Sequence, residues 1–367
     1  MRVTACVVSW NTAEHLPGAL SSLQEQTHSD LEIVVVDNAS VDGSAAVARG
    51  HSGVRVVANS ENRGFAGAAN QGVRLARASG SEAFLVCNPD VILEPDYIAR
   101  AVQALSGGQR RAAVQGRLWR MECKGSGDPK TIDTTGHLAF RTRLFRNRGE
   151  GSADLGQFDQ AGPVFGVSGA VALYRVAALD DVACEGEIFD EDLFAFWEDV
   201  DLDWRLQLRG FEAWYAPDAC GWHERGGAGP RRSAVVERLN FANRFLVVLK
   251  NDDPAALARA LGGFGVTSAL KAGELAATVP SAFIRSAGAV RLVPRMLAKR
   301  RLVQAGARVD PALVVERWFA PFDYAAWVAT WWGRVRSPRA RTLLRPLPGE
   351  RGGRPEHPHD HSGDLPA

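Results

Sequence analysis

The sequence predicts an α/β fold built on a parallel sheet and extended by helices at the carboxy-terminal end. In residues 1–90, short and nearly continuous apolar runs alternate with segments of helical periodicity. Continuous apolar strands are typical of parallel sheets, because helices cover both faces of such a sheet. From Ala234 to about Trp332 the pattern becomes helical. The chain has 367 residues, of which 46% are hydrophobic, so it can bury a full core.

The expected elements of the sheet follow one another in a regular order. Apolar runs predict the strands, and apolar residues that recur every three or four positions predict the helices between them. In chain order these elements are a strand at Val3–Trp10, a helix at Ala13–Gln26, a strand at Leu31–Val36, a short helix after Asp42, a strand at Val54–Ala58, a helix at Phe65–Ala78 and a strand at Ala83–Cys87.

The middle of the chain has weaker periodicity. Residues 107–162 are rich in Gly, Arg and polar side chains, which favours strands and loops, and we expect them to cover a cleft. Later strands are predicted at Phe165–Leu173 and Ala213–Ala216. We therefore divide the chain into an α/β domain (1–233), a helical, basic, Trp-containing region (234–345) and a tail (346–367) whose Gly, Pro and His content predicts disorder.

The composition excludes an extreme charge and argues against disulfides. The 43 Lys and Arg nearly balance the 42 Asp and Glu. The five cysteines are scattered, and Cys6 and Cys87 lie in apolar runs, which is typical of small buried hydrophobes in a reducing cytoplasm. The apolar start Val3–Trp10 is too short for a signal peptide. We expect no transmembrane helix, because charged residues interrupt the apolar stretch after Leu261.

Polar residues follow three of the predicted strands where each strand ends. These clusters are Ser9-Trp10-Asn11, Asp37-Asn38 and Asn88-Pro89-Asp90. In parallel sheets, ligands bind outside the carboxyl ends of the strands, so we expect one binding edge. Asp37 and Asn38 could hydrogen-bond a pyrimidine base or a ribose. Asp90 could hold Mg²⁺ or Mn²⁺ against a diphosphate, with a capping Asp in a proline turn as the alternative.

Two further segments suggest contact with an anionic ligand. Asn62–Asn70 opens a helix with very small side chains, which would let a ligand approach the free N–H groups of the helix start. The alternative is a glycine-requiring turn with tight helix packing. His223 follows an apolar run and precedes Gly226-Gly227-Ala228-Gly229. Its imidazole could complete a Mn²⁺ or Mg²⁺ site or touch phosphate, although a structural histidine is the alternative.

The most informative stretch is Phe194–Arg205, where an aromatic run is followed by four carboxylates, Glu198, Asp199, Asp201 and Asp203. From Asp199 to Gly210 the pattern predicts a helix. A helix start favours an ionised carboxylate, and aromatic neighbours limit water, so this is a suitable place for a general base. The alternative is ordinary capping, with Asp201 and Arg205 paired one turn apart.

The carboxy-terminal region is strongly basic. Its Lys and Arg residues between Arg285 and Arg345 face only three acids, and four tryptophans lie among them, Trp318, Trp327, Trp331 and Trp332. This pattern suits an anionic membrane surface, to which Arg295, Lys299, Arg300 and Arg301 are expected to contribute. Nucleic acid would fit equally well by charge, and a helical subdomain with a solvated basic face is the alternative.

Taken in order, six blocks of the chain resemble glycosyltransferase family 2, and most closely its rhamnosyltransferase-like bacterial branch. The resemblance covers roughly residues 1–230. The blocks are Val8–Asn11, Val35–Ser44, Glu61–Asn70, Asn88–Asp90, Gly169-Ala170 and Trp197–Leu202.

The resemblance implies a GT-A, Rossmann-like nucleotide-diphospho-sugar transferase fold and an inverting, metal-assisted reaction. Many relatives have Asp-x-Asp where this chain has Asn88-Pro89-Asp90, so one carboxylate is missing and strict metal dependence stays open. The family's functional residues can be carried over to this chain by position. The nucleoside would then be bound by Ser9, Asn11 and Asp37, and the diphosphate and sugar by Asn62, Gly64, Phe65 and Asn88. The divalent cation (Mg²⁺ or Mn²⁺) would be bound by Asp90 and His223, and the base would be Asp199, with Glu198 beside it.

We therefore expect a cytoplasmic enzyme, on the inner face of the cell membrane, that builds cell-envelope or surface polysaccharide. Rhamnose from dTDP-rhamnose is the expected donor sugar, and a glycan or lipid-linked glycan is the expected acceptor. The alternatives are a UDP- or GDP-sugar (galactofuranose, N-acetylglucosamine or mannose), a catalytically inert scaffold of the same fold, and a nucleotidyltransferase. Nucleic acid is not expected as a partner, because the catalytic half argues against it.

Overall fold

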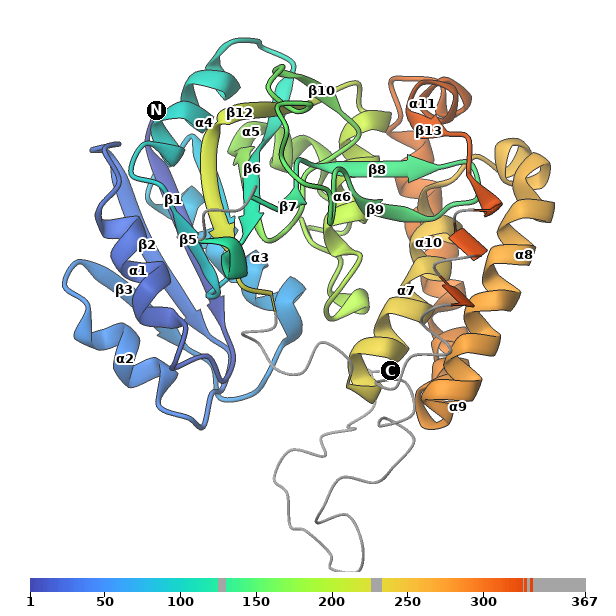
Figure 1. Ribbon diagram of the computed structural model, residues 1–367, viewed down its shortest axis with the longest axis horizontal. Helices are drawn as coiled ribbons and strands as arrows, with labels where there is room; N and C mark the ends of the chain where they lie inside the picture. Colours follow the sequence, from blue (N-terminus) through green and yellow to red (C-terminus); the bar gives the residue numbers. More distant parts are fainter. Residues whose placement is uncertain (125–129, 226–232, 326, 329–330, 333–367) are drawn as a thin grey trace, which may run out of the picture.

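A mixed sheet forms the centre of the molecule. The computed structural model describes residues 1–124, 130–225, 233–325, 327–328 and 331–332. The strands of the large sheet are β1 (Val3–Ser9), β2 (Leu31–Asp37), β3 (Val54–Ala58), β4 (Ala83–Cys87), β5 (Val91–Leu93), β6 (Arg111–Arg120), β7 (Ile132–Thr134), β10 (Gly162–Val164), β11 (Val171–Arg175) and β12 (Glu212–His223). They lie in the order β10-β12-β6-β11-β4-β1-β2-β3, with β5 beside β12 and β7 beside β6 (Figure 1).

The first four long strands confirm the predicted parallel sheet. Strand β1 pairs in parallel with both β2 and β4, and β2 pairs in parallel with β3. The predicted strands agree with the observed ones to within one residue. The register places Ser9 opposite Asp37, so two of the predicted polar clusters meet at the same edge of the sheet.

The second half of the sheet differs from the prediction. Strand β11 is antiparallel to both β4 and β6, and it begins at Val171 instead of Phe165. The preceding backbone joins no strand of the large sheet beyond β10, although Gly166 forms a single antiparallel bridge with His137, and side chains accept the next hydrogen bonds. The N–H groups of Val167, Ser168 and Gly169 donate to side chains of Asp203, Gln115 and Asp199, respectively.

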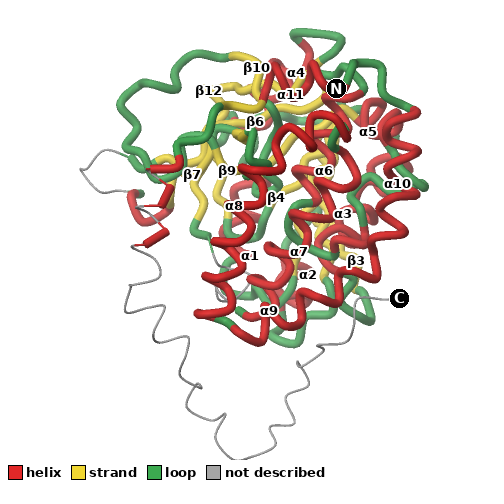
Figure 2. Tube along the Cα trace, turned by 90° about the vertical axis from the view of Figure 1, so that its right-hand side faces the viewer, coloured by secondary structure: helices red, strands yellow, loops and turns green. Residues whose placement is uncertain are grey.

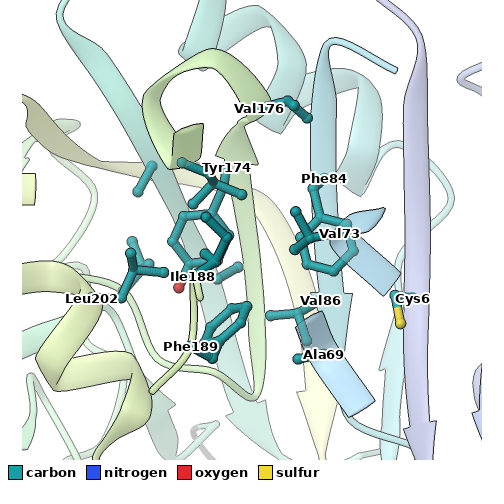
Figure 3. Close-up of a cluster of buried hydrophobic side chains, with 14 of the residues drawn as sticks. Cys6, Ala69, Val73, Phe84, Val86, Tyr174, Val176, Ile188, Phe189 and Leu202 are labelled. Atoms are coloured by element: carbon teal, nitrogen blue, oxygen red, sulfur yellow. The ribbon is translucent and has the colours of Figure 1, made fainter. Parts of the chain in front are cut away.

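Helices cover both faces of the sheet, as continuous apolar strands require. Side chains of α1, α2 and α4 pack on one face, and those of α3, α5 and α6 pack on the other. Figure 3 shows part of the second layer, in which Tyr174 and Leu202 lie on one side and Phe84 and Val73 on the other. These helices are α1 (Leu16–Gln24), α2 (Ser44–Gly50), α3 (Gly64–Ala78), α4 (Tyr97–Ser106), α5 (Val176–Val182) and α6 (Glu198–Leu208).

The predicted helical extension is present and packs on the side of the molecule away from β3 (Figure 1). Figure 2 shows this layer face-on, with α7 between α8 and α10 and with α9 at one end. The extension contains α7 (Ala234–Asn251), α8 (Pro254–Thr278), α9 (Pro280–Ser286), the 3₁₀ segment η3 (Ala287–Leu292), α10 (Val293–Ala305) and α11 (Pro311–Trp318), and beside it lies a small sheet of β8 (His137–Phe140), β9 (Phe145–Asn147) and β13 (Phe319–Ala320). Two short 3₁₀ segments are η1 (Met121–Cys123) and η2 (Glu191–Leu193).

Helix α6 belongs to two hydrophobic clusters. Its Leu202 packs toward the sheet, whereas Val200, Trp204 and Leu208 pack against α7, α10 and α11. The carboxy-terminal helices therefore share a core with the α/β domain. The division at residue 233 stays a prediction, and the tail 346–367 lies outside the described residues. In the part of the chain that is described, no helix combines the length and the apolar character needed to cross a bilayer.

The basic region contacts its own chain more than predicted. Lys299 is fully buried, and its Nζ lies 2.5 Å from Asp190 Oδ1 and 2.6 Å from Asp192 Oδ2. Arg300 donates to the carbonyl oxygens of Leu249 and Asp252. The expectation that these two side chains face a membrane is therefore wrong, because carboxylates and carbonyl groups inside the protein already hold them.

The tryptophans of the basic region are also less exposed than expected. Trp327 is only 3% exposed and packs against Phe322, with ring centroids 5.8 Å apart. Trp318 is half-buried, whereas Trp332 is 46% exposed. The expected membrane contacts from residue 333 onward, among them Arg334 and Arg336, lie outside the described residues.

Candidate active site

The first polar cluster lies where β1 and β2 end. Ser9 is fully buried and its hydroxyl lies 2.8 Å from that of Thr12. Asn11 adopts a left-handed backbone (φ 52°), and its side-chain oxygen accepts the N–H of Val41 at 2.9 Å. Both predicted residues thus shape the loop that follows β1, and Trp10 between them is 39% exposed.

Asp37 has the free acceptor that a nucleoside site requires. The residue is 3% exposed, and one carboxylate oxygen, Oδ2, accepts the N–H of Ser40 at 3.2 Å. The other oxygen, Oδ1, is buried and accepts no hydrogen bond from any residue that the structure describes. A buried acceptor without a partner is costly, so a ligand N–H or hydroxyl group would stabilise it.

Asn38 connects the second polar cluster to the segment that begins α3. Its amide nitrogen donates to Asn62 Oδ1 at 2.7 Å and to the carbonyl of Gly64 at 2.9 Å. Its oxygen accepts from Asn59 and from the N–H of Arg63. These four bonds use its full hydrogen-bonding capacity. Asn38 therefore builds the pocket wall, and the expectation that it hydrogen-bonds a base or ribose is wrong.

The start of α3 is closed by protein instead of being open to an anion. Gly64 has φ +69°, and a Cβ there would overlap with the carbonyl oxygen of Phe194. The N–H of Ala66 donates to that same carbonyl at 3.1 Å. The tight-packing alternative thus explains Gly64. Phe65 is half-buried and packs edge-on against Phe189, with ring centroids 6.1 Å apart.

Asp90 and His223 lie together, as a shared metal site would require. Asp90 Oδ1 is 3.3 Å from His223 Nε2, and both residues are buried. The other ring nitrogen, Nδ1, lies 2.8 Å from Asp133 Oδ2 on β7, and Arg225 pairs with Asp133. Burial favours the neutral ring, but the bonds to Asp133 and Asp90 outweigh it and raise the pKa of His223 to about 9.

The residues that could hold a divalent cation fit that role in chemistry and arrangement. A carboxylate and an imidazole face each other, and a second carboxylate orients the imidazole, which is the usual arrangement around a ligating histidine. Among the described residues, no three His, Cys, Asp or Glu side chains form a complete metal cluster. Diphosphate oxygens would therefore have to complete the coordination. The glycine run after His223 lies outside the described residues.

Asp199 is the only residue of α6 that is not buried. Its side chain is 18% exposed at the start of α6, and Oδ2 accepts the N–H of Gly169 at 2.9 Å. The next residue, Ala170, accepts the N–H of Asn88 through its carbonyl group at 2.8 Å. The segment of residues 168–170 therefore touches both the candidate base and the half-buried Asn88 of the Asn-Pro-Asp cluster.

Glu198 has a different environment from Asp199. It is only 5% exposed, and its Oε2 has no hydrogen-bond partner among the described residues. Burial and the charge of Asp199 raise the pKa of Glu198 well above the ordinary range. The capping alternative applies to a third carboxylate, since Asp201 pairs with Arg205 at 2.8 Å.

Three side chains near this site escaped the sequence prediction. Asp133 and His137 lie in the segment 107–162, where no periodicity marked them, and Asn243 lies on α7, outside the resemblance. The amide nitrogen of Asn243 lies within 3.0 Å of the carbonyl oxygens of residues 193, 195 and 196, just before α6. Asp203, which holds His137, had a weak signal, because it lies one turn after Asp199 on the same helix.

The family model of glycosyl transferase family 2 matches residues 4–183 of this chain. The chain belongs to glycosyltransferase family 2. This confirms the resemblance found in the sequence. The family 2 chain is 29% identical over 253 residues to an N-acetylglucosaminyl-diphospho-decaprenol L-rhamnosyltransferase of Mycobacterium tuberculosis (strain H37Rv), a match covering 62% of this chain and 77% of that protein.

A second relative is a poly-beta-1,6-N-acetyl-D-glucosamine synthase of Staphylococcus aureus (strain COL), which is 26% identical over 226 residues. The match covers 60% of the family 2 chain but only 49% of the synthase, so the chain spans about half the length of this relative.

Solved structures agree on the fold. The crystal structure of GalNAc-T7 with UDP, GalNAc and Mn²⁺ has a TM-score of 0.58 at 12% identity, over 90% of this chain and 57% of that one. Staphylococcus aureus TarS has a TM-score of 0.50 at 18% identity, over 83% of this chain and 52% of that one. The predicted GT-A fold with a helical carboxy-terminal region is thereby confirmed.

Proposed function

We propose that this chain is an inverting glycosyltransferase that moves a sugar from a nucleotide-diphosphate donor to a hydroxyl group of a cell-envelope or surface-polysaccharide acceptor. One observation carries the proposal. The partly exposed carboxylate of Asp199 and the Asn88-Pro89-Asp90 cluster contact the same three-residue segment, 168–170, so a base and a diphosphate site lie on either side of it.

Each residue has a role that follows from its surroundings. The buried, unpartnered oxygen of Asp37 supports binding of the nucleoside, with Ser9 and Asn11 shaping the loop beside it. Asp199 takes the proton of the acceptor hydroxyl group as that oxygen attacks the anomeric carbon. Attack from the side opposite the departing nucleoside diphosphate inverts this carbon, so no covalent enzyme intermediate is needed.

Asp90 and His223 would hold the divalent cation. When bound, this cation would neutralise the charge that develops on the departing diphosphate. Asp133 fixes the orientation of the His223 ring, and Arg225 keeps Asp133 in place. The missing carboxylate at Asn88 leaves two protein ligands, and the mixed oxygen and nitrogen set supports Mn²⁺ over Mg²⁺, which strongly prefers oxygen.

For the donor we propose rhamnose bound to dTDP, with a lipid-linked glycan as acceptor. The support is the Mycobacterium tuberculosis relative, whose name gives L-rhamnose as the sugar and a diphospho-decaprenol as the carrier. The Staphylococcus aureus relative is named for N-acetyl-D-glucosamine, which supports UDP-N-acetylglucosamine as the second candidate.

We also propose peripheral contact with an anionic membrane on the cytoplasmic side, through a smaller surface than the sequence predicted. Residues 254–309 contain nine Lys and Arg, of which Lys299 and Arg300 are held inside the protein, and one acid, Glu274, which is buried. On α9 and η3, Ile284 and Val290 are 70% and 68% exposed, beside the exposed Arg285 and Arg291. Apolar and cationic side chains presented together suit an anionic bilayer surface.

The donor is tested by thermal shift with dTDP-rhamnose, UDP-N-acetylglucosamine, UDP-galactofuranose and GDP-mannose, each with Mn²⁺ and with a chelator. We expect dTDP-rhamnose with Mn²⁺ to raise the melting temperature most, and Asp37→Asn to remove the shift. Chelation should also abolish transfer, and Mn²⁺ should restore it. A larger shift with another donor would replace rhamnose. If the donor binds but no nucleoside diphosphate is released in the presence of any acceptor, the inert scaffold would be favoured.

A further inference from the structure

A buried histidine lies behind the candidate base. His137 begins β8 and is 6% exposed, and its ring lies between two carboxylates of α6. Nδ1 is 2.7 Å from Asp203 Oδ2, and Nε2 is 3.6 Å from Asp199 Oδ2. Because Asp199 and Asp203 are one helical turn apart, both can face the same ring.

The carboxylate of Asp203 is fixed in position. Its two oxygens accept the N–H of Val167 at 3.1 and 3.0 Å, and a Cβ on Gly166 would overlap with it. The carbonyl of Gly166 accepts the backbone N–H of His137 at 2.8 Å. The histidine ring and its carboxylate partner are thus tied to the same short backbone segment, which leaves the ring one orientation.

The charges around this ring favour its protonated form. Tyr174 on β11 and Glu198 on α6 are the other titratable groups near Asp199, while Asp201 is engaged by Arg205. Burial alone would lower the pKa of His137, but the charges of Asp199 and Asp203 outweigh it and raise this pKa. Burial also raises the pKa of Asp203 to about 6, although the bond from His137 opposes this effect.

We infer that His137, held by Asp203, is a positioning residue whose charge holds the carboxylate of Asp199 in place, turned toward Gly169. At 3.6 Å the ring acts through its charge, so each oxygen of Asp199 accepts one backbone N–H, from Gly169 or Val200, and keeps a further lone pair for a substrate. The inference rests on the proposed role of Asp199 as the base. It requires no further reactant, because the acceptor proton goes to Asp199 while the C–O bond forms and the nucleoside diphosphate leaves.

The first test needs no turnover. In protein labelled with ¹⁵N-histidine, the ring signals of His137 are assigned by their loss in His137→Asn. We expect both ring nitrogens to be protonated at pH 7 and a neutral tautomer to appear in Asp203→Asn. A neutral ring at pH 7 in the unmutated protein would overturn the inference, whatever becomes of the proposed function. If His137→Asn does not fold, assignment through the backbone amides of the unmutated protein serves instead.

The second test connects the ring to catalysis. The release of nucleoside diphosphate from the best donor of the thermal-shift panel is followed between pH 5 and 9. In His137→Asn and His137→Gln, the acid limb of kcat should move about one pH unit upward. The KM for the donor should stay within about twofold of the value for the unmutated protein, because we expect donor binding to be unchanged. The matched control is His51→Asn. His51 lies on the far side of the sheet, where its ring forms a hydrogen bond with Gln24. An equal loss of activity at every pH would mean a structural role only.

Discussion

Asp199 and Glu198 are neighbours in the chain but occupy different environments. Asp199 is partly exposed and accepts a backbone hydrogen bond, whereas Glu198 is buried with one oxygen unpartnered. Burial and the neighbouring charge of Asp199 raise the pKa of Glu198 and so favour its protonated form, which does not accept a proton.

This difference predicts opposite results for two isosteric substitutions. Asp199→Asn should lower the rate of sugar transfer by roughly two to four powers of ten, because it removes the proton acceptor. Glu198→Gln should retain most of the activity, since an amide resembles a protonated carboxyl group in shape. Steady-state transfer with thermal melting as the folding control measures both. A severe loss in Glu198→Gln with normal Asp199→Asn would exchange the two roles.

The loop before α6 has an unfavourable backbone that a distant helix stabilises. Phe194, Phe196 and Trp197 all have positive φ values, 61°, 68° and 76°. Such conformations are costly for large side chains and persist only when neighbouring contacts hold them. Asn243 on α7 supplies three such contacts, all to carbonyl groups of this loop.

Removal of these contacts should therefore damage the site more than the fold. Asn243→Ala leaves buried carbonyl groups without donors, at a cost of about 1–3 kcal/mol in the free energy of unfolding. We expect transfer to fall at least about tenfold, because Asp199 follows this loop directly. Urea unfolding and kcat measure the two effects. The control is Asn240→Ala, one turn earlier on the exposed side of α7, where neither quantity should change. Equal effects at both positions would disprove this role.

The parallel strands and their polar ends could be predicted because each signal is local. A continuous apolar run followed by Asp37 or Asp90 contains both the strand and the residue at its end. The closure of α3 by Phe194 could not be predicted, because its partner lies 130 residues away in the chain. Asp133 and His137 escaped for a related reason. Short strands in an aperiodic segment carry them, and only the tertiary fold brings them to Asp90 and Asp199.

Buried ion pairs connect the carboxy-terminal helices to the rest of the molecule. Lys250 on α7 and Lys299 on α10 both reach Asp190, and Lys250 also reaches Asp201 at 2.9 Å. Burial would raise the pKa of Asp190, but the charges of Lys250 and Lys299 outweigh it and hold this pKa well below the ordinary range. These ion pairs therefore stabilise the folded protein at pH values above about 3.9, which is the pKa of Asp190 in the unfolded chain. The stabilisation is lost as the pH falls below this value.

Breaking this network should destabilise the whole protein. Lys299→Met leaves buried carboxylates with less positive charge, and we expect a loss of about 3–5 kcal/mol in the free energy of unfolding at pH 7. The loss should shrink below pH 4, where Asp190 of the unfolded chain begins to take up a proton. Arg301→Met, two residues away and exposed, should change stability by less than about 0.5 kcal/mol. Similar urea midpoints for both variants would contradict the assigned role of the network.

The membrane prediction changes with this result. Charge reversal at Lys299 would unfold the protein and test nothing, so the variant of choice is Arg285→Glu with Arg291→Glu. This variant should no longer float with phosphatidylglycerol vesicles at low salt, whereas the release of nucleoside diphosphate from the donor should be unchanged. The control is Arg49→Glu on α2, at the opposite side of the molecule, because it changes the charge by the same amount per residue. If the unmutated protein does not float with anionic vesicles, the membrane assignment is wrong.

The double burial of α6 limits how this protein can be divided or recombined. If the chain were cut before α7, Val200, Trp204 and Leu208 would lose the side chains that cover them, and the helix that carries Asp199 would present an apolar stripe to water. Exchange of the carboxy-terminal helices between relatives faces the same constraint. A chimera would keep α6 in place only if α6, α7, α10 and α11 were inherited together as one unit.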